Sequence, residues 1–210
     1  MGGGWRSLGN RQPFDPDAPP GRVFHAVLAV SVVGLLWSRS VPGTALAEGL
    51  AAAAALGLVA LAWAGRGVTY LIARRRQRAR RGAGRFLVAP AVGAVALLLV
   101  GLDAPLRTLW ALSRGAFEDV VEASGSPYRA AGPERWQGVE APDRIGLYRV
   151  TSVSRIGEAV IFWEAHGAFI DDAGFAYLPD GPDPALEAGW FESPDFHHLG
   201  GPWYAWTASW

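Results

Sequence analysis

Three long apolar stretches in the first half of the chain limit what it can fold into. They cover residues 21–37, residues 44–64 with an apolar continuation to residue 73, and residues 86–102. About 17 to 25 apolar residues suffice to cross the roughly 30 Å hydrocarbon core of a bilayer. None of the stretches has the polar face that a helix on the surface of a soluble protein needs. We therefore expect three transmembrane helices in a membrane domain over residues 21–102, with buried helices of a soluble protein as the alternative.

The arginines around these stretches predict an orientation. Residues 74–85 carry seven arginines and the N-terminal region carries three, whereas only Arg39, Arg107 and Arg114 lie near the opposite ends. Because arginine accumulates in cytoplasmic loops, we expect a multi-pass plasma-membrane protein with residues 1–20 in the cytoplasm and the C-terminal half outside. The loop arginines would also contact anionic lipid headgroups, and this set comprises Arg74, Arg75, Arg76, Arg78, Arg80, Arg81 and Arg85. They lack interleaved aromatic residues, so we expect no nucleic-acid partner.

Two features of the apolar half leave alternatives open. Residues 45–47, Ala-Leu-Ala, match the cleavage pattern of a signal peptide, so removal of the first stretch is one alternative. The second stretch carries Gly49, Ala53 and Gly57 at four-residue spacing. Small residues let helices approach closely, which predicts packing against the other two apolar helices, a partner protein or a second copy of the chain.

The two halves of the chain differ in charge. Residues 1–102 hold twelve arginines against three acidic residues, and residues 103–210 hold seven against sixteen, so the formal charges are +9 and −9. Such asymmetry indicates different surroundings for the two halves. The chain has no cysteine, which excludes disulfides, zinc–thiolate sites and iron–sulfur clusters. We expect no cofactor.

The periodicity of the second half predicts an α+β arrangement. Residues 103–143 read as a juxtamembrane amphipathic helix, lying on the membrane or on the following domain, and then a linker. Residues 144–210 read as a small antiparallel β domain of four or five strands, at 144–153, 158–165, 167–170, 174–178 and the C-terminal end. Asp171, Asp172 and Ala173 would form a hairpin turn that a left-handed Gly174 closes. The expected fold class is thus three transmembrane helices followed by an extracytoplasmic antiparallel β domain with one amphipathic helix.

Candidate catalytic residues are few. Asp171 and Asp172 could take part in acid–base chemistry, although a turn explains both. Asp195, His197 and His198 lie in the densest polar segment, which also reads as a solvated acidic loop. Because neighbouring histidines on an extended chain point to opposite faces, we expect no metal site there.

Tryptophan is concentrated in the second half, which holds seven of the ten. Aromatic side chains gather in protein cores, at membrane interfaces and on partner-binding surfaces. The candidates for a partner-binding surface are Trp190, Trp203, Tyr204, Trp206 and Trp210, with the core as the alternative.

Residues 174–181 and 201–204, together with the order of Arg-rich loop, Ala-rich helices and Trp-rich C-terminal half, resemble uncharacterised small multi-pass membrane proteins of high-G+C Gram-positive bacteria. The resemblance contains no motif of known chemistry. It implies a bacterial plasma membrane and carries over no functional residue.

The leading functional hypothesis is a non-enzymatic membrane protein whose acidic, Trp-rich outer domain binds a partner. One alternative is a membrane-tethered, hydrolase-like enzyme that uses the Asp and His residues named above. Another is an accessory subunit of a transport complex. The ionisable residues that such a pathway would need, His25, Glu48 and Arg66, all lie near the ends of the apolar stretches.

Overall fold

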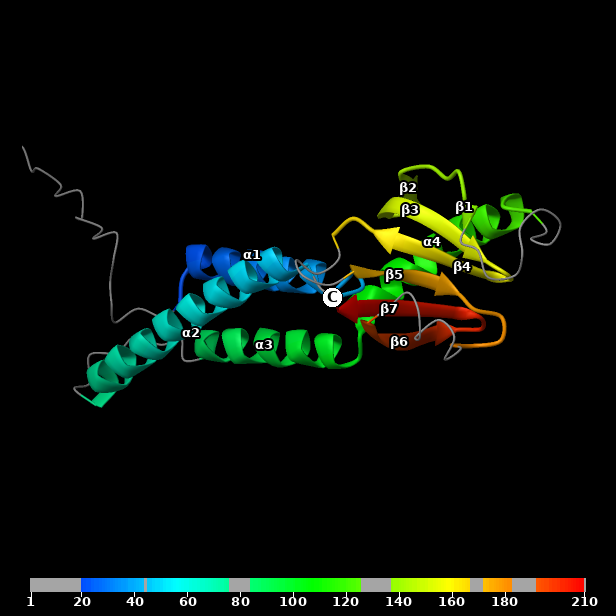
Figure 1. Ribbon diagram of the computed structural model, residues 1–210. Coiled ribbons are helices and arrows are strands. Elements are labelled where there is room, and N and C mark those ends of the chain that lie inside the picture. The colour runs from blue at the N-terminus through cyan, green and yellow to red at the C-terminus, as the bar shows by residue number, and fades with distance from the viewer. Residues whose placement is uncertain are drawn as a thin grey trace, which may run out of the picture.

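A computed structural model describes residues 20–43, 45–75, 84–125, 137–166, 172–182 and 192–209. Figure 1 shows two parts, with three helices running side by side at one end and a β-sheet with a fourth helix at the other. The helices are α1 (Arg22–Ser38), α2 (Leu46–Arg75), α3 (Arg85–Gly101) and α4 (Ala104–Ala123). We refer to the sheet and α4 together as the β-domain.

The expectation of three transmembrane helices is wrong. Among the described residues, a single helix, Ala47–Arg75, is long and apolar enough to cross a bilayer by itself. Helices α1 and α3 have 17 residues each, which at a rise of 1.5 Å per residue makes them only about 25 Å long. Helix α3 passes the same test only when joined to α4, from which it is bent by 55°. The first and third apolar stretches therefore fall at the lower limit of length, because α1 ends at the connection to α2 and α3 ends at the bend into α4.

Helix α2 is longer than its most apolar part. It continues past Arg66 to Arg75 and so includes the apolar continuation of the second stretch. Its small residues allow a close approach to α1, where a Cβ atom added at Gly34 would lie 3.6 Å from the Cβ of Ala52. Only 11 % of its apolar window is buried within the chain. The apolar surface of α2 thus faces outward, unlike that of a core helix.

The C-terminal half forms a seven-stranded antiparallel sheet, larger than the four or five strands expected. Its order is β1-β3-β4-β5-β7-β6, and β2 pairs with β3. The strands are β1 (Gln137–Gly138), β2 (Arg144–Ile145), β3 (Tyr148–Ile156), β4 (Ala159–Glu164), β5 (Asp172–Tyr177), β6 (Glu192–Gly200) and β7 (Trp203–Ser209).

Two segments predicted as turn or loop are strands. Asp172 and Ala173 begin β5, and Gly174 lies inside that strand without a left-handed φ. A Cβ atom at Gly174 would lie 1.8 Å from the carbonyl oxygen of Phe162, so close strand approach requires glycine there. The polar segment around Asp195 is the edge strand β6, whose pairing with β7 shifts register near Ser193, which has φ 47°. Pairing with β7 outweighs the weak local preference of this polar sequence. The predicted strand 167–170 lies outside the described residues.

Helix α4 covers one face of the sheet, which decides between the two positions considered for the amphipathic helix. Trp110 and Phe117 of α4 are buried against Phe162, Phe175 and Trp203. A second cluster holds Ile161, Ala176, Leu178, Trp206 and Ala208. The core between α4 and the sheet is therefore largely aromatic, and the second cluster contains no residue of α4.

Candidate functional site

A cavity of about 530 Å³ lies where the apolar helices meet the β-domain. We call it the junction cavity. Its walls come from the end of α1, the α1–α2 connection, the start of α2, Leu109 of α4 and the segment from Asp143 to Arg149, with the end of β4 closing it. A cavity of this volume is within the range that small-molecule sites occupy.

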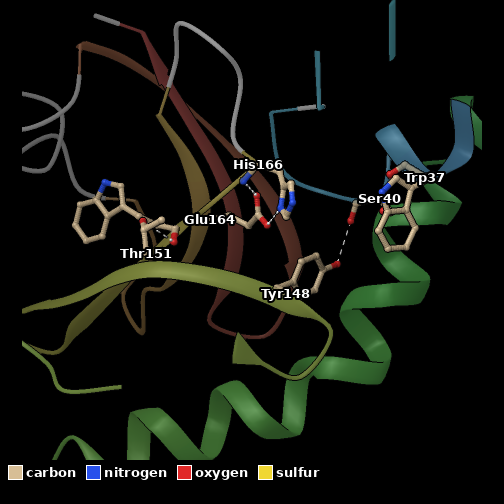
Figure 2. A network of polar contacts seen from close by, with 7 residues as sticks. Trp37, Ser40, Tyr148, Thr151, Glu164 and His166 are labelled. Carbon is tan, nitrogen blue, oxygen red and sulfur yellow. Dashed lines mark hydrogen bonds and ion pairs between the residues drawn. The ribbon is translucent and has the colours of Figure 1, made fainter. Parts of the chain in front are cut away.

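A buried carboxylate with two partners lies at the end of β4. The Glu164 side chain is only 1 % exposed. The backbone N–H of His166 donates to Oε2 of Glu164 at 2.6 Å, and the His166 ring donates from Nδ1 to Oε1 at 2.9 Å. Figure 2 shows both contacts, with the His166 ring turned back onto the strand. These bonds compensate for the removal of the carboxylate from water.

Tyr148 links this part of the sheet to the helices. Its hydroxyl donates to the carbonyl oxygen of Ser40, in the α1–α2 connection, at 3.1 Å (Figure 2). Burial, together with the negative charge of Glu164, raises the pKa of the Tyr148 phenol well above its ordinary value. The phenol therefore stays protonated at neutral pH and acts as a hydrogen-bond donor.

Two arginines on the same wall face each other across the β2–β3 hairpin. Arg144 and Arg149 are register partners on either side of the turn at Gly146 and Leu147. Gly146 has φ +57°, and a Cβ atom there would lie 2.6 Å from the Cβ of Ser113. The Leu147 N–H also donates to Ser113 Oγ at 3.1 Å, so α4 fixes the hairpin in position. Among the described residues, neither Arg144 nor Arg149 has a side-chain hydrogen bond or ion pair.

A smaller cavity of about 260 Å³ lies beside β6 and holds two of the predicted catalytic residues. Asp195 and His197 line it together with Asp103. The His197 Nε2 atom lies 3.8 Å from Asp103 Oδ2 and accepts from Arg107 Nη2 at 3.3 Å. Within the described ranges, no group of three metal-ligating side chains is placed to hold a metal ion.

The other predicted catalytic residues do not join this group. His198 points away from His197 and donates to the carbonyl oxygen of Gly201 at 2.8 Å, which stabilises the β6–β7 turn. Asp172 is exposed at the start of β5, opposite Ala208. Asp171 lies outside the described residues.

Two of the three predicted partner-binding aromatics that the structure describes are buried. Trp203 and Trp206 are buried in the two core clusters, which is the alternative role considered for them. Tyr204 is half-buried against the rings of Phe196 and His198. Trp190 and Trp210 lie outside the described part of the chain.

The described arginines of the basic loop lie far from the β-domain. Arg74 and Arg75 end α2, and Arg85 begins α3. In Figure 1 these helix ends are opposite the ends that meet the sheet. Arg76, Arg78, Arg80 and Arg81 fall in the gap that the structure does not describe.

The sequence did not identify the junction cavity, because its residues come from distant segments. One signal was present: Val160, Phe162 and Glu164 alternate on β4, so a carboxylate occupies a position whose neighbours face the core. A charged residue in such a position is rarely buried unless it is paired.

No protein-family model matches the chain, and no curated protein or solved structure matches it either. Its function therefore has to follow from the chemistry of its own residues.

Proposed function

We propose that this chain is a membrane-anchored, non-enzymatic binding protein. Helix α2 crosses a plasma membrane, and the β-domain, on the outer side, holds a ligand or a segment of a partner in the junction cavity. The observation that carries this proposal is the cavity itself, which has the volume of a ligand site and walls from both parts of the chain.

The apolar surface of the helices supports the membrane anchor. Large apolar side chains on α1, α2 and α3 are exposed, including Val30, Leu61 and Leu97. A contiguous apolar surface of this kind is unfavourable in water and favourable in lipid. Arginines mark the end of α2 that lies away from the β-domain, which favours a cytoplasmic position for that end and an outer position for the β-domain.

The polar groups of the cavity favour binding over catalysis. The Tyr148 phenol is held protonated and donates to a backbone carbonyl. The Ser40 hydroxyl donates to the carbonyl oxygen of Trp37 at 2.6 Å and is not directed at His166. His166 in turn is bound to Glu164. Groups that could serve as nucleophile and base are thus engaged in separate structural bonds, whereas catalysis needs them in contact with each other.

A photo-crosslinking residue at position 147 tests this proposal in native membranes. Leu147 lines the cavity and is exposed, and Leu112 of α4 is an exposed leucine outside it, which makes a matched control. We expect a defined adduct from position 147 and none from position 112 after illumination. The absence of any adduct at 147, or equal adducts at both positions, would contradict a binding role for the cavity.

The enzyme alternative has one observation in its favour. Asp195 and His197 line one small cavity with Asp103. The 3.8 Å separation of His197 and Asp103 is longer than a hydrogen bond, and both side chains are about half-exposed. We rank this function second. An activity on model ester or phosphoester substrates that disappears in His197→Gln would reverse the ranking.

A further inference from the structure

We infer that the junction cavity binds the phosphodiester headgroup of a glycerophospholipid, with Arg144 and Arg149 as the phosphate ligands. This inference rests on the proposed membrane anchoring, and it concerns the side of the membrane opposite the basic loop. The chemistry that it requires is a single phosphate ester, which a lipid or a soluble phosphate ester could supply.

The arginine pair is the first support. Arg144 and Arg149 lie directly opposite each other on paired strands, an arrangement in which two like charges destabilise the pairing. Neither guanidinium has a partner among the residues that the structure describes. Guanidinium groups bind phosphate oxygens through paired N–H donors, so one phosphate between two arginines would remove the repulsion.

The hairpin that carries these arginines is already fixed. Gly146 lies against Ser113, and the Leu147 N–H donates to the Ser113 hydroxyl. The backbone therefore needs no rearrangement to present both side chains, which lowers the entropic cost of binding. A fixed backbone that presents two exposed arginines, neither with a partner among the described residues, suits an anion site.

The position of the cavity favours a lipid as the source of the phosphate. Its wall includes Trp37, 61 % exposed at the end of α1, and Leu147, 53 % exposed. Exposed tryptophan is typical of the level where membrane headgroups lie. The adjoining faces of α1 and α2 are apolar, so acyl chains can lie along them while the headgroup enters the cavity.

The other charges of the cavity limit the ligand to a small net charge. Glu48, Asp143 and Glu164 face the same space as the two arginines. His166 already binds the Glu164 carboxylate, and the remaining two acids would repel a polyanion. A single phosphate ester with one or two negative charges meets these limits, and a polyphosphate does not.

The test measures lipid binding to the full chain in maltoside micelles, which contain no phosphate. Phosphatidylglycerol, diacylglycerol with the same acyl chains, glycerol 3-phosphate and inorganic phosphate are titrated separately, and bound molecules are counted by native mass spectrometry. The variants are R144Q, R149Q and the double variant. R114Q is the matched control, because Arg114 lies on α4 in a surface pair with Glu118.

We expect the dissociation constant for the tightest bound phosphatidylglycerol to be at least about tenfold higher in the double variant, because charge-assisted hydrogen bonds are lost. The same dissociation constant should differ from wild type by less than about twofold in the R114Q control, because Arg114 belongs to an exposed pair. Diacylglycerol should bind weakly to all forms. Circular dichroism and thermal unfolding of each variant check that the fold is retained.

Unchanged phosphatidylglycerol binding in the double variant would overturn the inference. Equal affinity for glycerol 3-phosphate and for phosphatidylglycerol would show that the cavity binds phosphate esters. It would also overturn the assignment of the ligand to a lipid. A crosslinked adduct at position 147 that contains no phosphate would overturn the inference while leaving the proposed binding function in place. Failure of that crosslinking experiment would overturn both.

Discussion

The apolar helices and the β-domain use similar residues in opposite ways. Leu61 of α2 is 71 % exposed, whereas Phe117 of α4 has no exposed surface. A helix satisfies its own backbone hydrogen bonds, so its apolar side chains can face lipid without cost. A sheet surrounded by water has to bury its apolar face against another layer, which α4 provides. The comparison teaches that the direction of apolar side chains, rather than their number, distinguishes the two regions.

The largest effect that can test this comparison is the loss of a core ring. Phe117→Ala removes a side chain packed against Tyr148, Phe162, Phe175 and Trp203. We expect the β-domain to lose about 3–5 kcal/mol of unfolding free energy. The measurement is denaturant unfolding in micelles, followed by tryptophan fluorescence. Leu61→Ala is the matched change on α2 and should lower the unfolding free energy by less than about 1 kcal/mol. Equal losses in the two variants would contradict the difference between the two regions.

The second largest effect on stability is expected at the junction cavity, where Glu164 binds His166. Glu164→Gln replaces one of the two acceptor oxygens that His166 uses with an amide. We expect a loss of about 1–3 kcal/mol, because the amide nitrogen cannot accept one of the two hydrogen bonds that His166 donates to this buried side chain. Unfolding of Glu118→Gln provides the reference, since the exposed Arg114–Glu118 pair should contribute at most about 1 kcal/mol. A loss at Glu164 no larger than this reference would mean that the hydrogen bonds between His166 and the buried carboxylate do not stabilise the junction.

Tyr148→Phe tests the link between the β-domain and the α1–α2 connection. Loss of the hydrogen bond to Ser40 should cost about 1–2 kcal/mol at neutral pH. Because the pKa of Tyr148 is raised in the folded state, the phenol contributes stability below the unfolded tyrosine pKa of about 10 and loses it as the pH rises above that value. The stability difference between wild type and variant should therefore shrink above about pH 10. Unfolding free energies at neutral and alkaline pH measure this, and a constant difference would contradict the raised pKa.

The smallest effect is expected at a polar atom inside the aromatic core. The indole N–H of Trp110 is buried without a hydrogen-bond partner among the described residues. Trp110→Phe removes this unsatisfied donor and keeps a ring, so we expect a change below about 1 kcal/mol. Trp110→Ala should cost about 3–5 kcal/mol, because it leaves a large cavity. Similar losses in the two variants would show that the N–H has a partner, such as a bound water.

Local pattern was enough to predict several elements. The periodicity of residues 104–123 predicted α4, and the β-branched and aromatic runs predicted β3 and β4. The length of the apolar stretches was a poor guide to the number of membrane spans. A helix of 17 residues lies at the lower limit for crossing a bilayer, and the sequence does not show where a helix bends. Strand β6 was missed because a polar edge strand depends on its partner for stability.

The candidate site could not be predicted in the same way. Ser40 and Tyr148 are 108 positions apart, and only the contact between the α1–α2 connection and the β-domain brings them together. Asp195 and His197 were identified from composition, but their neighbour Asp103 belongs to the bend between α3 and α4. Which side chains share a cavity is decided by contacts between distant elements.

The sequence by itself determined the division into an apolar, basic half and an acidic, aromatic half, because composition and period are local properties of the chain. It did not show the turn at Gly146, because residues 144–153 read as one continuous strand, whereas the structure divides them into β2 and β3. Only the tertiary structure decided that α2 is the one helix among the described residues that reaches the length of a span. It also decided that Trp203 and Trp206 are core residues, and that Glu164 and the two arginines share one cavity. The physical reason is that burial and pairing depend on which surfaces meet, and those contacts join residues that the chain keeps far apart.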